Sequence, residues 1–282
     1  MKIPPNFKYI RTYTLDEYYE KANQISLPLI ISGGTVAVLM LKNRLIRPEA
    51  VIDISQIPEL NIVKINKDDV FVGANTKLYK LKDVLPNDSA SELIVKSAST
   101  VGDIAIRSMG SVGGNVCLGD PSNDLPVALT AIDAQAVIGK KGGITYLPIK
   151  NFYIKPFKTV LNKGEILLGV NYKMLNGYRT SYKKHFINFL DHYVGIVAAI
   201  AKIEENVIKD FKMAIGGEVV GKPIKFDLSE FSNVDEINII KERMFDYVNM
   251  MHIENNRFGT ANYKKKVLYT LISRAIDEVL KL

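Results

Sequence analysis

The chain has 282 residues, of which 47% are hydrophobic and 24% are charged, the composition of an ordinary globular protein. Its net charge of +7 comes from lysines and arginines that are scattered along the chain, whereas a nucleic-acid binder gathers them in a basic stripe. The single cysteine, Cys117, excludes a disulfide framework, a cysteine-rich zinc site and an iron–sulfur cluster held by this chain alone. We find no apolar run long enough to span a membrane and no signal peptide, so we expect a cytoplasmic protein without membrane insertion.

The first part of the chain predicts the order strand, helix, strand, helix, strand. Strands are expected at 7–11, 27–31 and 51–54, where short runs rich in β-branched residues lie between breakers. Thr14 and Glu17 have the spacing of a capping box, so the first helix is expected to begin at Thr14. The second helix is expected to begin at Val36, after a glycine turn, with Thr35 as its N-cap. Backbone N–H groups at such a turn, together with the positive helix end, suit an anion.

The order of predicted strands and helices changes after residue 61. A hairpin of strands at 62–65 and 70–73 is followed by two short helices near 76–85 and 89–98. A second glycine-rich turn at 110–115 precedes an apolar helix at 127–132. Glycines there permit positive φ, and consecutive N–H groups in that geometry form a concave nest for phosphate. Further strands are predicted at 134–139, 144–148 and 165–172.

The last third of the chain predicts a small antiparallel sheet followed by two helices. Its strands are expected at 179–184, 194–203 and 211–214, and its helices at 234–250 and 260–281. The final helix has apolar residues at helical intervals, which indicates packing against a core. Strands followed by helices stacked on them are typical of an α+β fold.

Side chains for acid–base or metal chemistry are few. His185, His192 and His252 have no triad-like or metal-ligand spacing, so we expect them at the surface or in packing contacts. Asp120 and Asp124 lack the further oxygen ligands that a hard cation needs, and helix capping with one ligand contact is the preferred interpretation. We therefore predict no catalytic side chain and no metal site, and any redox chemistry would belong to a cofactor. Two glycine turns suggest a pyrophosphate, although tight turns with nothing bound are the alternative.

Three segments carry a more specific signal because their order and spacing are kept together. They are SGGT at 32–35, RSMGSVGGN at 107–115 and GDPSNDLPVAL at 119–129. These segments resemble those of the FAD-binding medium subunits of molybdenum hydroxylases, the group of xanthine dehydrogenase, carbon monoxide dehydrogenase and aldehyde oxidoreductase. Later landmarks at 165–168 and 181–199 are also similar, so the resemblance covers essentially the whole chain.

The resemblance implies a PCMH-type flavoprotein fold. Two α/β FAD-binding subdomains would occupy residues 1–55 and 56–177, and a C-terminal domain with a three-stranded antiparallel sheet and helices would occupy residues 178–282. FAD would lie between the two subdomains. The residues that the resemblance assigns to the pyrophosphate are Ser32, Gly33, Gly34, Thr35, Val36, Ser111, Val112, Gly113, Gly114 and Asn115.

The resemblance also assigns residues to the rest of the cofactor. Asp124 would accept a hydrogen bond from the sugar part, and Leu167 would lie by the flavin together with Lys183 or Lys184. A solvated surface position is the alternative for either lysine. Val36 stands where the family commonly has Asp or Ser, and Ser108 stands where it has Asn, so each loses one polar contact to FAD. His192 and Tyr193 occupy a stretch that approaches the flavin in relatives, with packing as the alternative.

By the same resemblance, the chain is the FAD-carrying medium subunit of a heterotrimeric molybdenum-containing oxidoreductase that acts on an aldehyde, carbon monoxide or a purine. A large subunit would carry molybdopterin and oxidise the substrate, and a small subunit would carry two [2Fe–2S] clusters. Electrons would pass from the clusters to FAD and on to an external acceptor. A self-contained FAD-dependent oxidoreductase and a non-catalytic nucleotide-binding module remain as alternatives. The sequence names neither the acceptor nor the substrate, for which a small aldehyde is our hypothesis.

Overall fold

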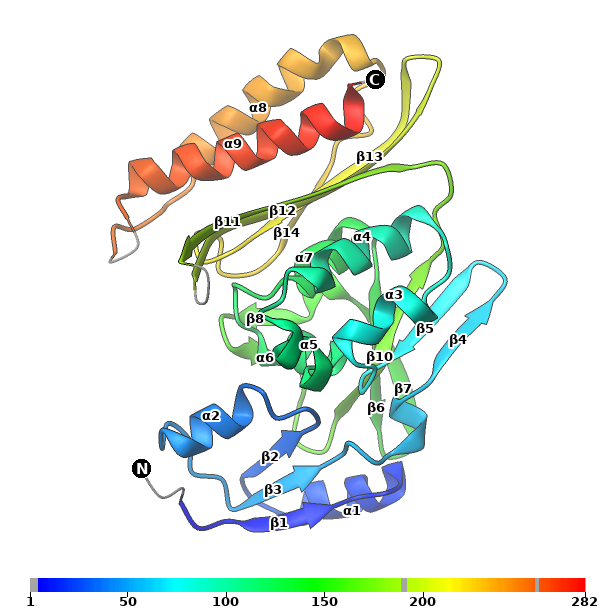
Figure 1. Ribbon diagram of the computed structural model, residues 1–282, viewed down its shortest axis with the longest axis vertical. Coiled ribbons are helices and arrows are strands. Elements are labelled where there is room, and N and C mark those ends of the chain that lie inside the picture. The colour runs from blue at the N-terminus through cyan, green and yellow to red at the C-terminus, as the bar shows by residue number, and fades with distance from the viewer. Residues whose placement is uncertain (1–4, 189–191, 257–258, 282) are drawn as a thin grey trace.

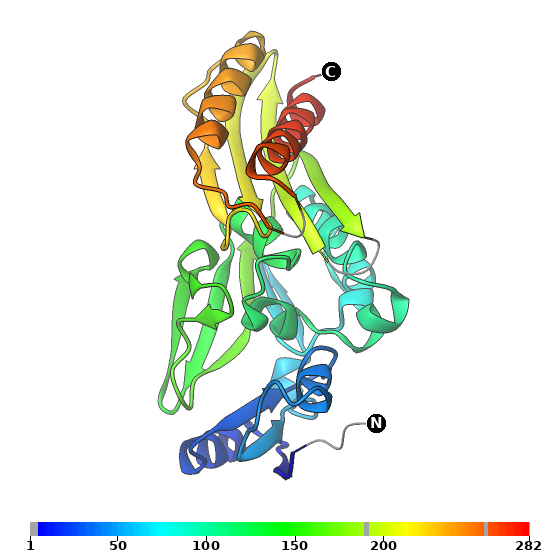
Figure 2. The same ribbon diagram turned by 90° about the vertical axis from the view of Figure 1, so that its left-hand side faces the viewer.

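The computed structural model describes residues 5–188, 192–256 and 259–281, with the side chains of 187, 188, 192 and 193 left undescribed. These residues form three tiers stacked along the long axis of the molecule, each built around its own β-sheet (Figures 1 and 2). The strands of the first tier lie within residues 8–53, those of the middle tier within 63–173, and those of the C-terminal tier within 179–227.

The first tier is a small parallel sheet with two helices. Its strand order is β1-β3-β2, and both neighbouring pairs are parallel. Thr14 caps α1 as predicted, because its hydroxyl accepts the N–H of Glu17 at 3.2 Å. The elements are β1 (Lys8–Arg11), α1 (Leu15–Gln24), β2 (Pro28–Ile31), α2 (Ala37–Lys42) and β3 (Ala50–Asp53).

The middle tier is a five-stranded antiparallel sheet with order β4-β5-β10-β6-β7 and a group of short helices. Its strands are β4 (Val63–Asn66), β5 (Asp69–Gly73), β6 (Gln135–Lys140), β7 (Gly143–Pro148) and β10 (Ile166–Lys173), with the small pair β8 (Tyr153–Lys155) and β9 (Lys158–Thr159) beside it. Its α-helices are α3 (Leu81–Val84), α4 (Ser89–Ser99), α5 (Ile104–Met109), α6 (Val112–Leu118) and α7 (Leu125–Ala131). Its 3₁₀ turns are η1 (Pro58–Leu60), η2 (Leu78–Lys80) and η3 (Ile149–Asn151).

The second glycine segment differs from its prediction. Residues 112–118 form helix α6, and Ser111 caps it by accepting the N–H of Gly114 at 3.1 Å. None of the glycines at 110, 113 and 114 has a positive φ. The glycine-rich turn predicted at 110–115 therefore leads directly into a helix, and Gly113 is needed there for close packing against Ala74 rather than for a positive φ.

The C-terminal tier has one strand more than the three predicted. Its antiparallel sheet has the order β11-β12-β13-β14, and the short edge strand β14 pairs only with β13. The antiparallel sheet and the two helices on it are otherwise confirmed. The elements are β11 (Arg179–Asn188), β12 (His192–Glu204), β13 (Val207–Gly216), β14 (Ile224–Asp227), the 3₁₀ turn η4 (Val234–Glu236), α8 (Ile237–Met250) and α9 (Ala261–Leu280).

Strand β12 is buried on both faces of its sheet. Ile196, Ala198 and Ile200 belong to the core of the middle tier, whereas Val197 and Ala199 belong to the core beneath α8 and α9. Successive side chains of a strand point to opposite faces, so burial on both sides produces the continuous apolar run in the sequence. None of the helices in the described ranges has the length and apolar character needed to cross a bilayer.

The first tier is joined to the middle tier through Tyr18. This side chain is buried, and its hydroxyl donates to the backbone carbonyl of Glu165 at 2.9 Å. Around it, residues of the first tier such as Ile52 share one core with Ile166 and Leu168 of the middle tier.

Replacing Tyr18 with Phe leaves that carbonyl without its donor. We expect Tyr18→Phe to lower the free energy of unfolding by about 1–2 kcal/mol in urea denaturation. Tyr13→Phe is the matched control, because Tyr13 is exposed and its side chain makes no hydrogen bond within the described residues. Equal stability of the two variants would contradict the role assigned to Tyr18.

Candidate functional site

A cleft separates the first tier from the middle tier. It consists of two adjoining hollows with volumes of about 260 and 400 Å³. The carboxyl end of β2, the start of α2 and the start of α6 form its walls. The residues that line both hollows are Ile30, Ile31, Ser32, Ser111, Gly114 and Cys117.

The first glycine segment forms one wall of the wider hollow. In the described part of the chain, the backbone N–H groups of residues 33–36 have no hydrogen-bond acceptor. Gly34 has φ +72°, a left-handed conformation that glycine adopts without strain. Consecutive free N–H groups beside a left-handed glycine are suited to an anion, as the sequence predicted.

The capping of α2 does not follow the prediction. Val36, not Thr35, occupies the N-cap position, and no side chain caps the helix. Val36 is exposed at the rim, and both residues line the wider hollow. Since α2 has only six residues, the free N–H groups matter more for anion binding than the dipole of so short a helix.

Two buried polar atoms lack partners at this cleft. Ser32 Oγ and Asn75 Oδ1 are both buried and have no hydrogen bond within the described residues, and both residues line the narrower hollow. The amide of Asn75 is held in place because its Nδ2 donates to the carbonyl of Ile54 at 2.7 Å. An unsatisfied buried polar atom costs about 1–3 kcal/mol, so both atoms favour a ligand that hydrogen-bonds to them. Asn75 was missed by the sequence analysis, which assigned it no motif.

The second glycine segment lies beside the cleft, but its backbone N–H groups already donate hydrogen bonds within the protein. Val112 N–H donates to Thr76 O at 2.9 Å, Gly113 N–H donates to Ala74 O at 2.7 Å, and Ser111 accepts from both Gly114 and the N–H of Asn115. The N–H groups of residues 112–115 therefore already have acceptors within the protein, unlike the free N–H groups expected of a phosphate nest at this segment. This segment contributes an unobstructed surface to the cleft, because Gly114 is exposed there and has no side chain.

The two glycines of α6 have different surroundings. A Cβ on Gly113 would lie 2.7 Å from the Cβ of Ala74 and 2.9 Å from its carbonyl oxygen. A Cβ on Gly114 would meet only Ser111 Oγ, at 3.1 Å, within 4 Å. Gly113 is thus required for packing, whereas Gly114 leaves room on the side of the cleft.

Asp124 lies in a buried polar cluster beside the cleft. It is 2% exposed, and its Oδ1 accepts hydrogen bonds from Thr100 Oγ1 at 2.9 Å, Lys184 Nζ at 2.6 Å and the hydroxyl of Tyr182. Asp124 stands at the N-cap of α7 but makes no side-chain capping bond. The neighbouring Asn123 lines the wider hollow, so the cluster supports that end of the cleft from behind.

The two candidate lysines lie on opposite faces of β11. Lys184 points toward Asp124, and burial lowers the pKa of its ammonium while the Asp124 carboxylate opposes this shift. Lys183 forms an ion pair with Glu278 of α9. Successive side chains of a strand point to opposite faces, which explains why the two lysines are separated. Lys184 is therefore the lysine that faces the middle tier.

The remaining predicted residues are spread over the molecule. Leu167 is buried and lines the narrower hollow, whereas Lys184 lines neither hollow. His185 Nε2 lies 3.0 Å from the hydroxyl of Tyr263, and His252 is exposed beside Glu254. The side chains of His192 and Tyr193 lie outside the described residues.

The described residues of the cleft include no metal centre. Over the described ranges, no group of three or more His, Cys, Asp or Glu side chains is arranged to hold a metal ion. Burial raises the pKa of the Cys117 thiol to about 12, so at neutral pH it is a protonated thiol and a poor nucleophile. The residues of the cleft can supply hydrogen bonds to a ligand, a surface that fits its shape and exclusion of water.

Comparison with known proteins identifies relatives over the whole length. Residues 5–172 match the family described as the FAD-binding domain in molybdopterin dehydrogenase. The medium chain of glyceraldehyde dehydrogenase from Sulfolobus acidocaldarius is 32% identical over 287 aligned residues, covering 98% of this chain and 99% of the relative. The medium chain of carbon monoxide dehydrogenase from Hydrogenophaga pseudoflava is 28% identical over 169 residues, covering 60% of this chain and 59% of the relative.

Solved structures match the fold at lower identity. Carbon monoxide dehydrogenase from Hydrogenophaga pseudoflava superposes with a TM-score of 0.88 at 21% identity, covering 98% of each chain. Quinoline 2-oxidoreductase from Pseudomonas putida 86 gives a TM-score of 0.89 at 18% identity, covering 99% of this chain and 98% of the other. The α+β arrangement of three tiers is therefore a fold found in known oxidoreductases.

The two glycines of α6 give a matched pair of substitutions. We expect Gly113→Ala to lower the free energy of unfolding by about 1–3 kcal/mol, because α6 must move away from Ala74. Gly114→Ala is expected to stay within about 1 kcal/mol of the parent, since alanine favours helix and meets little else. Urea denaturation of both variants checks this, and a larger loss for Gly114→Ala would contradict the geometry.

Because only Lys184 of the two lysines forms a buried ion pair, replacing it is expected to cost much more stability than replacing the adjacent Lys183. Lys184→Met leaves Asp124 buried without its cation and is expected to cost about 3–5 kcal/mol. Lys183→Met removes a half-exposed pair with Glu278 and is expected to cost at most about 1 kcal/mol. Thermal and urea unfolding of the two variants measure the difference, and similar losses would show that Lys184 is not paired as described.

Proposed function

Since the chain belongs to the family of FAD-binding medium subunits of molybdenum hydroxylases, we propose that it holds FAD in the cleft between its first and middle tiers. The observation that carries this proposal is the wall formed by residues 33–36, whose backbone N–H groups have no acceptor in the described chain. Bound FAD accepts electrons one at a time or in pairs, and so links one-electron clusters to two-electron acceptors. The protein supplies the binding site, its orientation and its electrostatics.

The pyrophosphate is assigned to the first glycine segment. The N–H groups of residues 33–36 donate to its oxygens, and the hydroxyl of Ser32, which lacks a partner in the protein, adds a further donor. Ser111, Gly113 and Asn115 contribute the shape of the other wall, where Gly114 permits close approach, and the buried Val112 supports that wall from the core. This division differs from the sequence-based expectation of two equivalent phosphate nests.

The remaining assignments follow the two hollows of the cleft. Leu167 contributes an apolar surface in the narrower hollow, which also contains Tyr18 and the unpartnered Asn75 Oδ1. Asp124 and Lys184 act behind the wider hollow, where their ion pair holds Asn123 and β11 in position. Lys183 is assigned to the interface with α9 through Glu278. The subdomain boundaries at 55/56 and 177/178 fall between the strands of successive tiers.

We further propose the complex in which the subunit works. A large subunit carries molybdopterin and oxidises the substrate, and a small subunit carries two [2Fe–2S] clusters that deliver electrons to the FAD of this chain. An external acceptor removes them, and the complex works in the cytoplasm. A small aldehyde is the proposed substrate class, supported by the glyceraldehyde dehydrogenase medium chain that matches this chain from end to end.

Affinity capture of the full chain from its native cells under anaerobic conditions tests this assembly. We expect a flavin spectrum together with iron, molybdenum and two further polypeptides. Flavin on a solitary chain that turns over a substrate would favour a self-contained flavoenzyme instead. A captured complex without flavin would contradict the proposed function.

A bulky residue at Gly114 tests the cleft directly. Gly114→Val is expected to reduce retained FAD by more than about tenfold in a folded protein, because the side chain fills the path of the cofactor. Gly143→Val is the matched control, since a Cβ there would meet only Lys140 Cε, at 3.9 Å, within 4 Å. Flavin absorbance after gel filtration measures retention, and full occupancy in a folded Gly114→Val protein would reject this placement of FAD.

A further inference from the structure

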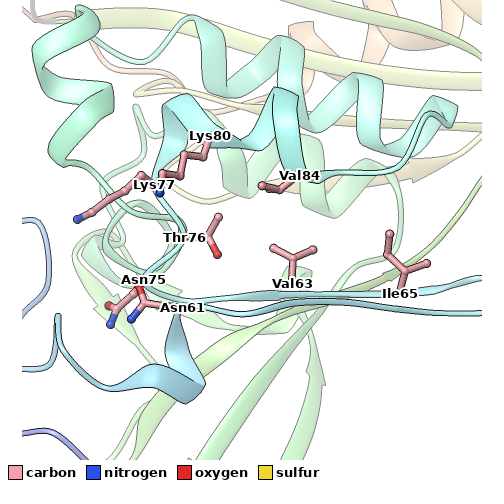
Figure 3. A pocket seen from close by; sticks show the side chains of 8 residues that line it. All are labelled: Asn61, Val63, Ile65, Asn75, Thr76, Lys77, Lys80 and Val84. Carbon is pink, nitrogen blue, oxygen red and sulfur yellow. The ribbon is translucent and has the colours of Figure 1, made fainter.

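A second cavity lies in the middle tier, separate from the cleft. It has a volume of about 570 Å³, within the range of small-molecule sites, and lies between the β4–β5 hairpin on one side and η2 with α3 on the other (Figure 3). Asn75 lines both this cavity and the cleft and so forms part of the wall between them. The full lining is Asn61, Val63, Ile65, Asn75, Thr76, Lys77, Lys80 and Val84.

The cavity has a polar end and an apolar end. Figure 3 shows Lys77, Lys80 and Thr76 together with the two asparagines at one end, and Val63, Ile65 and Val84 at the other. A ligand that fits both ends therefore has a polar head and a carbon body.

Thr76 is the buried group that points to a ligand. It is only 7% exposed, and its Oγ1 has no hydrogen-bond partner in the part of the chain that the structure describes, although its backbone N–H and carbonyl are both bonded. Its oxygen points into the cavity in Figure 3. A hydroxyl in that position is a donor without an acceptor, and a bound acceptor recovers about 1–3 kcal/mol.

The charge at the polar end is positive. Lys77 Nζ donates to the carbonyl of Met109 at 2.8 Å, a neutral acceptor, and Lys80 lies over the ring of Tyr79. Within the described ranges, no carboxylate forms an ion pair with either lysine. Burial lowers the pKa of Lys77, the Asp53 carboxylate opposes this, and the Lys80 ammonium adds to it. An anion at this end relieves that repulsion.

We propose that this cavity binds a small organic acid. Its carboxylate or phosphate group lies against Thr76, Lys77 and Lys80, and its apolar body lies over Val63, Ile65 and Val84. The site does not depend on FAD or on the proposed function, because none of its three head-group contacts lines the cleft.

Titration of the full chain, with and without added FAD, tests the site. Butyrate and butyl phosphate serve as probes, butanol is the uncharged control, and isothermal titration calorimetry measures binding. We expect saturable binding of one equivalent of at least one acid and none of butanol. The tighter of the two acids identifies the head group.

Variants locate that binding. Thr76→Val keeps the shape and removes the hydroxyl, and Lys80→Gln removes one charge; each is expected to weaken binding by about tenfold. Lys64→Gln is the matched control, since Lys64 is an exposed lysine of β4 that does not line the cavity. Absence of saturable binding, or unchanged affinity in both Thr76→Val and Lys80→Gln, would overturn the proposal. Binding seen only after FAD is removed would place the acid in the cleft and would also overturn it.

Discussion

The close approach of Gly33 to the carbonyl of Met109 determines how the first tier is seated on the middle tier. A Cβ on Gly33 would lie 1.8 Å from that oxygen, so only glycine permits the backbone of the first segment to pass α5. The same carbonyl accepts a hydrogen bond from Lys77. With the segment held there, its free N–H groups face the cleft, and the second cavity lies on the other side of Asn75.

The C-terminal tier depends on a different constraint, the burial of β12 on both faces. The side chains that alternate along this strand pack against α7 on one side and α9 on the other. A polar side chain buried between these elements is costly unless it forms a hydrogen bond or an ion pair. Asp124 and Lys184 form such a bonded pair between α7 and β11. A buried ion pair adds little net stability compared with apolar packing, but it fixes the relative position of the two elements. That position supports the wider hollow of the cleft.

The sequence predicted the strands and helices well where one local signal dominated, as in the capping box at Thr14 and the apolar run of β12. It predicted three C-terminal strands because β14 is short and lies at an edge, where little burial marks it. The two glycine segments were predicted to be equivalent, because the amino-acid sequence alone does not show that Ser111 caps a helix and accepts the N–H of Gly114. Asn75 and Thr76 were missed for a similar reason, since an unpartnered atom becomes evident only after every neighbour is placed. Lys183 and Lys184 could be separated only by the direction of β11.

Above all, we propose that the first glycine segment binds the pyrophosphate of FAD. A crystal structure of the chain with FAD bound tests it most directly. We expect pyrophosphate oxygens within hydrogen-bond distance of the N–H groups of residues 33–36 and of Ser32 Oγ, with Gly114 on the opposite side. A pyrophosphate held instead by the N–H groups of residues 112–115, or lying outside the cleft, would contradict it.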